Sequence, residues 1–320
     1  MKQMLPAVKT ILSECFNLQK SETFLIITDT PCSTTAYSFY SLSAKLHTKI
    51  SFFILPTINK KKNFKHLSAL IPAITQHAAC LIMTSTSLSH TPMRRIACRE
   101  GVRIISMPAV SFDVITRNKG GLNPATEKLS KKIADILSIG SRATLTTPAG
   151  TRLTFSLKNR KGYADSCLVH APGRFSNFPA GEACAAPSDK SVNGTLIIDG
   201  SFPGVGLMNE PVKMLIKNGS VSRIYGNKEA VIIRKMIRPF GKTARIIAEV
   251  GIGTNCRARL KGCTVEDEKV KGLVHVALGD NTSFGGTNAS GCHYDAVIRR
   301  PTLTIDSRTI LEQGKIHINS

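Results

Sequence analysis

The sequence predicts two domains: an α/β domain with a parallel sheet, then a β-rich α+β domain that carries a metal site. Two observations predict the architecture. In residues 1–140, short apolar segments alternate with segments of helical spacing, which is the pattern of βαβ units. From residue 141 onward, strand-like segments with Gly and Asn turns dominate. A third observation, polar residues inside these later strands, predicts the site.

The first domain is built from four apolar segments that we expect to be strands. They read "TFLIITDT" (23–30), "KISFFILPT" (49–57), "AACLIMTSTS" (78–87) and "VRIISMPA" (102–109). Segments with helical spacing separate them, so a parallel sheet is expected. Neither a G-x-G-x-x-G nor a Walker motif follows the first strand, and we predict no nucleotide site there.

The domain boundary is predicted near residue 140. Asn123-Pro124 opens a helix whose apolar residues include Ile133 and Leu137, and Gly140 suits its end. A hairpin is expected around residues 148–150, and one further helix over 227–241. The predicted domains are therefore 1–140 and 141–320.

The charge of the chain is strongly basic, with 43 Lys and Arg against 21 Asp and Glu, a net charge of +22. Such an excess raises the prospect of nucleic-acid binding. However, the basic residues are dispersed, aromatic residues make up only 6% of the chain, and Trp is absent. Base stacking needs aromatic side chains, so the composition argues against nucleic acid as a partner.

The sequence predicts neither a signal peptide nor a membrane-spanning segment. No run of 18 apolar residues occurs, and the first 22 residues contain no long apolar segment. The nine cysteines are scattered and form no C-x-x-C pair, as expected for a reducing compartment. These features predict a cytoplasmic protein without a membrane partner.

Five polar residues lie in strand-like segments where apolar residues are expected. In "SGCHYDAV" (290–297), His293 and Asp295 share one face, because side chains alternate along a strand. Glu249 lies in "ARIIAEVGIG", His275 in "GLVHVALGDN" and Glu182 in "NFPAGEACAAP". Burying such groups unpaired costs several kcal/mol, so we expect them to converge.

Two histidines and three carboxylates are a workable ligand set for two divalent metals, with one carboxylate bridging. A pair of cations about 3.5–4 Å apart can activate a shared water and polarise a carbonyl. Each residue alone has an ordinary explanation: Glu249 in a salt bridge, for example, or His275 as a hydrogen-bonded core histidine. Only the set as a whole predicts a metal site.

Four segments resemble, in order, the C-terminal half of the aminopeptidase T family of metalloaminopeptidases, which are leucyl aminopeptidase-like. The resemblance is to the family's short bacterial and archaeal forms. The segments are "GRFSNFPAGEACAAP", "AEVGIGTN", "EDEKVKGLVHVALGDNTSFGG" and "CHYDAVIRRPTLTID", within residues 140–315. By this resemblance, the family's dinuclear metal ligands fall on Glu182, Glu249, His275, His293 and Asp295.

The resemblance implies a hydrolase that removes N-terminal residues from short peptides. Two Zn, Co or Mn ions per chain would activate the water, Glu182 and Glu249 would be catalytic, and Glu249 would shuttle the proton. It also leaves room for a homodimer. One departure is clear: the longer aminopeptidases have a Tyr shortly after "H-x-A-L-G", and this chain has "DNTSFGG". Tyr294 is expected to point away from its neighbouring ligands.

A second hypothesis comes from the same superfamily resemblance. Non-haem Fe(II) ring-opening dioxygenases of the dihydroxypyridine type use two histidines and one aspartate. His275, His293 and Asp295 would supply them, with Glu182 turned to the substrate. Glu249 would then lack an obvious partner, which favours the two-metal hydrolase. A third hypothesis is a non-catalytic basic binding protein that kept the fold.

Overall fold

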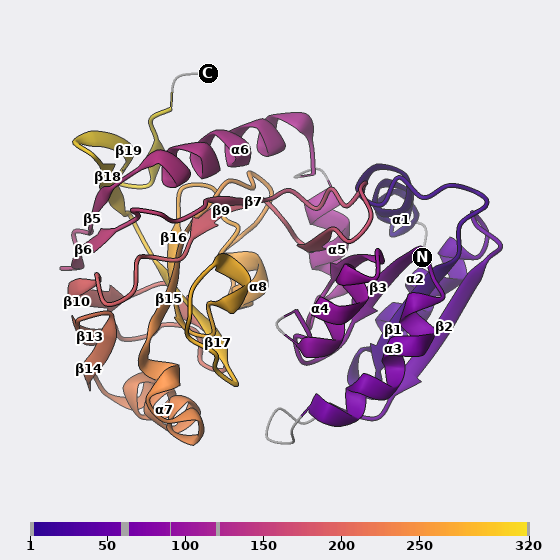
Figure 1. The fold of residues 1–320 in the computed structure, drawn as a ribbon, viewed down its shortest axis with the longest axis horizontal. Helices are drawn as coiled ribbons and strands as arrows, with labels where there is room; N and C mark the ends of the chain where they lie inside the picture. Colours follow the sequence, from indigo (N-terminus) through magenta and orange to yellow (C-terminus); the bar gives the residue numbers. More distant parts are fainter. Residues whose placement is uncertain (1–2, 59–63, 90, 120–121, 319–320) are drawn as a thin grey trace. The chain divides into compact units, whose positions relative to one another are not determined.

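The computed structural model describes residues 3–58, 64–89, 91–119 and 122–318. The chain forms two compact units (Figure 1). One contains Met1–Leu122 and Asp165–Ala180, and the other Asn123–Ala164 and Gly181–Ser320. The predicted fold class is confirmed, with a parallel α/β sheet in the first unit and antiparallel sheets in the second. The domain limits at residue 140 stay a prediction.

The first unit has a five-stranded sheet in the order β2-β1-β3-β4-β8, and each neighbouring pair is parallel. Its strands are β1 (Phe24–Asp29), β2 (Ile50–Leu55), β3 (Ala79–Met83), β4 (Arg103–Ser106) and β8 (Phe175–Asn177). Its α-helices are α1 (Leu5–Thr10), α2 (Ser33–Ser43), α3 (Ile71–Thr75), α4 (Pro92–Arg99) and α5 (Phe112–Asn118). All residues of β1, β3 and β4 are buried, which explains their continuous apolar runs.

The second unit contains two sheets joined through one core. The first has the order β14-β13-β10-β6-β5-β18-β19-β20. Its strands are β5 (Arg142–Thr146), β6 (Arg152–Ser156), β10 (Asn193–Ile198), β13 (Val212–Lys217), β14 (Ser220–Tyr225), β18 (Thr302–Ile305), β19 (Arg308–Glu312) and β20 (Lys315–Ile316). The hairpin expected around residues 148–150 is the antiparallel pair β5 and β6.

The other sheet carries the candidate site and has the order β12-β11-β17-β16-β15-β9-β7. Its strands are β7 (Tyr163–Asp165), β9 (Glu182–Ala185), β11 (Ser201–Phe202), β12 (Gly206–Leu207), β15 (Ile247–Gly253), β16 (Val274–Gly279) and β17 (His293–Ile298). The helices of this unit are α6 (Pro124–Ile139), α7 (Lys228–Ile237) and α8 (Thr264–Asp267). The predicted helices are thus α6 and α7, and Asn123 caps α6 through its side chain.

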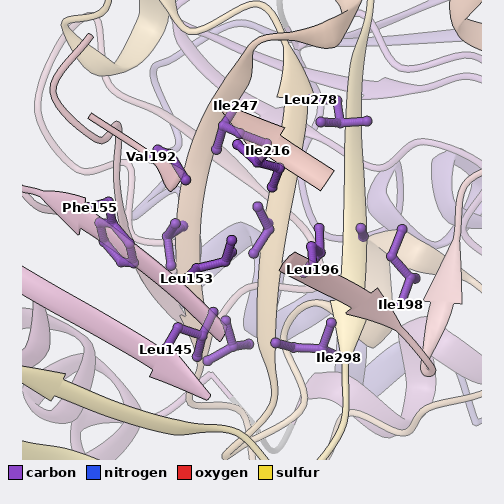
Figure 2. Close-up of a cluster of buried hydrophobic side chains, with 14 of the residues drawn as sticks. Leu145, Leu153, Phe155, Val192, Leu196, Ile198, Ile216, Ile247, Leu278 and Ile298 are labelled. Carbon is purple, nitrogen blue, oxygen red and sulfur yellow. The ribbon is translucent and has the colours of Figure 1, made fainter. Parts of the chain in front are cut away.

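The hydrophobic core of this unit gathers side chains from both sheets (Figure 2). Leu145, Leu153 and Leu196 come from one sheet, and Ile247 and Ile298 from the other. The predicted apolar face of α6 joins the same cluster. Within the described residues, no helix is long and apolar enough to span a bilayer.

Candidate metal centre

The five predicted residues lie on one face of the sheet, on strands β9, β15, β16 and β17. Directly paired residues of antiparallel strands share a face. Glu182 pairs with Gly253, and His275 pairs with Gly251. Ala277 lies between Glu249 and Asp295, and Gly279 pairs with His293. The register therefore brings the two histidines and three carboxylates together, as the period-two pattern predicts.

The opposite face of the same strands is apolar. Val250, Val274 and Val276 alternate with the polar residues and belong to the hydrophobic core. Tyr294 also lies on that face, where its ring centroid is 5.9 Å from that of Phe202. The prediction that Tyr294 points away from its neighbouring ligands is confirmed.

Glu249 is the centre of the cluster. Its Oε1 atom lies 3.2 Å from Nε2 of His275, and its Oε2 atom lies 3.3 Å from Nε2 of His293. Glu182 approaches His275 at 3.5 Å, and Asp295 approaches His293 at 3.3 Å. The residues form two groups with donor atoms within 4.8 Å: Glu182, Glu249 and His275, and Glu249, His293 and Asp295.

The two groups differ in exposure. The side chains of His275 and Glu249 are 1% and 4% exposed, whereas those of His293 and Asp295 are 9% and 17% exposed. A small molecule from solution would therefore meet His293 and Asp295 first.

Gly251 makes room for the His275 ring. A Cβ atom at residue 251 would lie 2.2 Å from Nε2 of His275, far inside van der Waals contact. Gly251, the first glycine in "AEVGIG", is thus required by the site, because the imidazole packs directly on the backbone of the adjacent strand.

The charges of the cluster support one another. Burial opposes ionisation of Glu249, but the hydrogen bonds from His275 and His293 outweigh it and hold its pKa well below the usual range. Burial likewise opposes ionisation of Asp295, yet the charge of His293 lowers its pKa to about 2. Burial disfavours the charged form of His275, but the hydrogen bond to Glu249 and the charge of Glu182 raise its pKa to about 9. Glu249 and Asp295 are therefore anionic at neutral pH.

The donor set fits a divalent transition metal. Nδ1 of His293 lies 2.7 Å from the carbonyl oxygen of Asp280, a partner that fixes Nδ1 as the protonated nitrogen. Nε2 then faces Glu249 and Asp295 with a lone pair, unless a proton or a metal occupies it. Nδ1 of His275 is buried without a hydrogen-bond partner among the described residues. Imidazole and carboxylate donors suit Fe, Mn, Co and Zn alike.

Lys269 is a member of the site that the sequence analysis missed. Its Nζ atom lies 2.5 Å from Oε1 of Glu182 and 2.8 Å from Oε1 of Glu268, and the residue is fully buried. In "EDEKVKG" it looks like part of a charged turn after α8, and no local pattern distinguishes it. Only the tertiary structure places this ammonium group beside a predicted metal ligand.

Phe284 supplies an aromatic surface beside His293, the more exposed of the two clustered histidines. The two ring centroids are 5.8 Å apart, and Tyr163 lies 5.8 Å from Phe284 on an edge-to-face geometry. Phe284 stands in "DNTSFGG", the loop where the longer aminopeptidases have their Tyr. Aromatic and apolar side chains typically line small-molecule sites.

The fold and this donor set define a two-unit protein with a His and carboxylate centre of the kind that binds metal. A family model described as NicX, 2,5-dihydroxypyridine 5,6-dioxygenase, matches residues 3–318, and the chain belongs to this family. The chain is 24% identical over 257 residues to the 2,5-dihydroxypyridine 5,6-dioxygenase of Pseudomonas putida KT2440. That alignment covers 75% of this chain and 71% of the relative.

Two solved structures share the fold. The 2,5-dihydroxypyridine dioxygenase from Pseudomonas putida KT2440 matches with a TM-score of 0.86 and 18% identity, over 99% of this chain and 98% of that one. AmpT from Thermus thermophilus matches with a TM-score of 0.68 and 12% identity, over 99% of both chains. The resemblance to aminopeptidase T thus holds for the fold, at a distance.

The prediction of a metalloaminopeptidase is wrong, and with it the hydrolase class and the role in proteolysis. The family of the chain is the dioxygenase family, which was the second hypothesis. The error has a physical reason: two histidines and a few carboxylates serve both hydrolytic metals and non-haem iron. The sequence motifs therefore predicted the fold and the donor residues. The reaction class depends on the residues that surround these donors, which the motifs do not include. The cytoplasmic location, the homodimer and the absence of a nucleic-acid partner stay predictions.

Proposed function

We propose that this protein is an Fe(II)-dependent dioxygenase that opens the ring of a dihydroxypyridine or a close hydroxylated relative. Family membership over residues 3–318 supports the reaction class. The structural observation that carries the proposal is the pair His293 and Asp295, adjacent on one strand face and on the accessible side of the cluster. His275 belongs to the other group of donor atoms, and Glu249 is common to both groups. By residue type, His275, His293 and Asp295 are the two-histidine, one-carboxylate set of non-haem iron oxygenases.

In this proposal His275, His293 and Asp295 would hold the iron, which would activate dioxygen toward the ring. Glu249 sits between the two imidazoles, within hydrogen-bonding distance of His275 and 3.3 Å from His293. Both contacts are made to Nε2, and in His293 this is the nitrogen that the bond of Nδ1 to Asp280 leaves for a metal. Glu249 would therefore lie on the metal side of the two imidazoles, where a single iron would give it a partner as a further carboxylate donor.

Asp295 is suited to hold charge and not to move protons. As a proposed iron ligand, Asp295 would have its charge committed to the metal and would be a weak base. The proton of a substrate hydroxyl would therefore need another acceptor. Glu182 is an unsuitable one, because Lys269 already neutralises it in the buried part of the site.

Phe284 suits a flat heteroaromatic substrate. Its ring beside His293 offers a surface on which another aromatic ring can stack, next to the proposed iron ligand.

The test is iron content and oxygen consumption on the full chain. Wild-type protein loaded anaerobically with Fe(II) should bind about one iron per chain and consume one dioxygen per 2,5-dihydroxypyridine lost. His293→Ala should lose both properties. The control His317→Ala removes a half-exposed histidine paired with Glu312 and should keep both.

Iron-loaded protein that consumes no oxygen with any dihydroxypyridine would sink the proposed reaction. A stoichiometry near two metals per chain, lost stepwise in Glu182→Ala, would instead return the site to the dinuclear design.

A further inference from the structure

A pocket in the first unit is lined mainly by helix α4. Its volume is about 450 Å³, and its lining consists of Pro92, Arg94, Arg95, Ile96, Cys98, Arg99 and Gly173. None of these residues belongs to the candidate metal centre. The volume lies within the range of about 300–1,000 Å³ that is common for small-molecule sites, and the depression is open to solvent.

The lining is strongly positive. It includes three arginines and no acidic residue. Arg95 and Arg99 are four residues apart on one helix, where like charges repel each other. Helix α4 thus concentrates positive charge on a concave surface that offers no carboxylate of its own.

Arg94 is the anchored member of the three. Its Nε atom donates to the carbonyl oxygen of Ser89 at 2.6 Å, and its guanidinium carbon lies 4.3 Å from the ring centroid of Phe175. These contacts fix the side chain before any ligand arrives, which lowers the entropic cost of binding.

Arg95 is partly buried and partly exposed. Its Nη1 atom is buried and has no hydrogen-bond partner among the described residues. A buried guanidinium N–H without an acceptor is unfavourable, and native structures rarely leave one. Because Nη1 is closed to solvent, a ligand in the pocket would meet the exposed part of the Arg95 guanidinium, and its negative charge would relieve the repulsion from Arg99.

We propose that the α4 pocket binds a small molecule bearing phosphate or carboxylate groups. The planar guanidinium fork matches both oxyanions in a bidentate manner. Three positive charges call for a ligand with at least two negative ones. Pro92 and Ile96 offer apolar surface to the rest of the molecule. The concave, one-helix lining suits a small molecule and not a nucleic-acid strand.

The test is calorimetric titration of the full, iron-loaded chain at low ionic strength. Inorganic pyrophosphate represents the phosphate source and succinate the carboxylate source. One of them should bind with a Kd below about 1 mM. The double variant Arg95→Gln, Arg99→Gln should weaken that binding about tenfold or more, and Arg95→Lys, which keeps the charge, should weaken it less.

A matched control separates the pocket from the general charge of the chain. The double variant Arg152→Gln, Arg223→Gln removes the same two charges from exposed positions on β6 and β14, and its affinity should equal that of wild type. A third titration uses a short single-stranded oligonucleotide. The proposal fails if neither small anion binds, if the two double variants lose affinity equally, or if the oligonucleotide binds and the small anions do not. Thermal melting confirms that each variant is folded.

The failure of this proposal would not touch the proposed dioxygenase, because the two sites share no residue. Ring-opening activity and anion binding are measured separately, on the same preparation.

Discussion

The ammonium group of Lys269 lies 2.5 Å from a carboxylate oxygen of Glu182, and the two side chains are only 1% and 8% exposed. Few proteins bury a lysine so completely without a paired charge. Here the pair lies under the candidate metal centre, and Glu268 accepts from the same ammonium group at 2.8 Å. Burial raises the pKa of Glu268 well above its usual range, against the charge of Lys269. One cation thus serves two buried carboxyl groups.

Replacing Lys269 by Met should therefore be strongly destabilising. Breaking a buried pair leaves an uncompensated charge, which costs about 3–5 kcal/mol. The measurement is urea unfolding of the metal-free protein. Lys131→Met is the matched control, because Lys131 also lies 2.5 Å from a carboxylate, Glu127, but is 64% exposed. Its loss should cost less than about 1 kcal/mol. Equal costs for the two variants would show that the buried pair has no special weight.

Gly251→Ala should weaken metal binding while leaving the fold intact. The added methyl group would lie 2.2 Å from Nε2 of His275, so the imidazole must move away from Glu249. We expect at least tenfold weaker metal binding, as is typical when a ligand loses its orientation. Metal titration measures the affinity, and circular dichroism measured separately shows whether the variant is folded. A folded Gly251→Ala protein with wild-type affinity would contradict the packing described for His275.

Phe284→Ala should affect the substrate and not the metal. Aromatic pairs contribute about 0.5–1.5 kcal/mol, so KM for a dihydroxypyridine should rise about 2- to 10-fold. Iron content should stay at the wild-type level, because Phe284 contributes no donor atom. Phe284→Tyr keeps the aromatic surface and serves as the control. A lower iron content in Phe284→Ala, or an unchanged KM, would remove the proposed stacking role.

Asp306→Asn should weaken the second unit in a pH-dependent way. Both carboxylate oxygens of Asp306 accept backbone N–H groups, from Ser141 and Arg142 at 2.8 Å each. These hydrogen bonds lower its pKa. The stabilisation is therefore present above the unfolded pKa of about 3.9 and is lost as pH falls through the lower folded value. Wild type should melt above the variant at pH 7, and the gap should close on acidification. A constant gap would assign the effect to packing.

Strand periodicity explains how much of the site the sequence could predict. Glu249, His275, His293 and Asp295 stood out because each breaks an apolar alternation, and the observed register places them on one face. Lys269 follows no such alternation, since it lies outside the strands and reaches Glu182 across 87 residues of sequence. A contact between residues so far apart in the sequence leaves no local pattern.

The fold was predictable for a similar reason, and its exception is instructive. The alternation of apolar and helical segments predicted four parallel strands of the first unit. The fifth, β8, comes from residues 175–177, after the chain has already begun the second unit. Its three residues are too few for a periodic signal. The reaction class was missed because the same donors serve two chemistries.

Strands β15, β16 and β17 present the hydrophobic core on one face and the donor residues on the other. Alternate residues of the same three strands therefore serve stability and the candidate site. Substitutions at the donor residues, or in the loops that border them, can change the site while the core residues keep the protein folded. The same fold can therefore carry different sites, because the residues that keep it folded are not the residues that make the site.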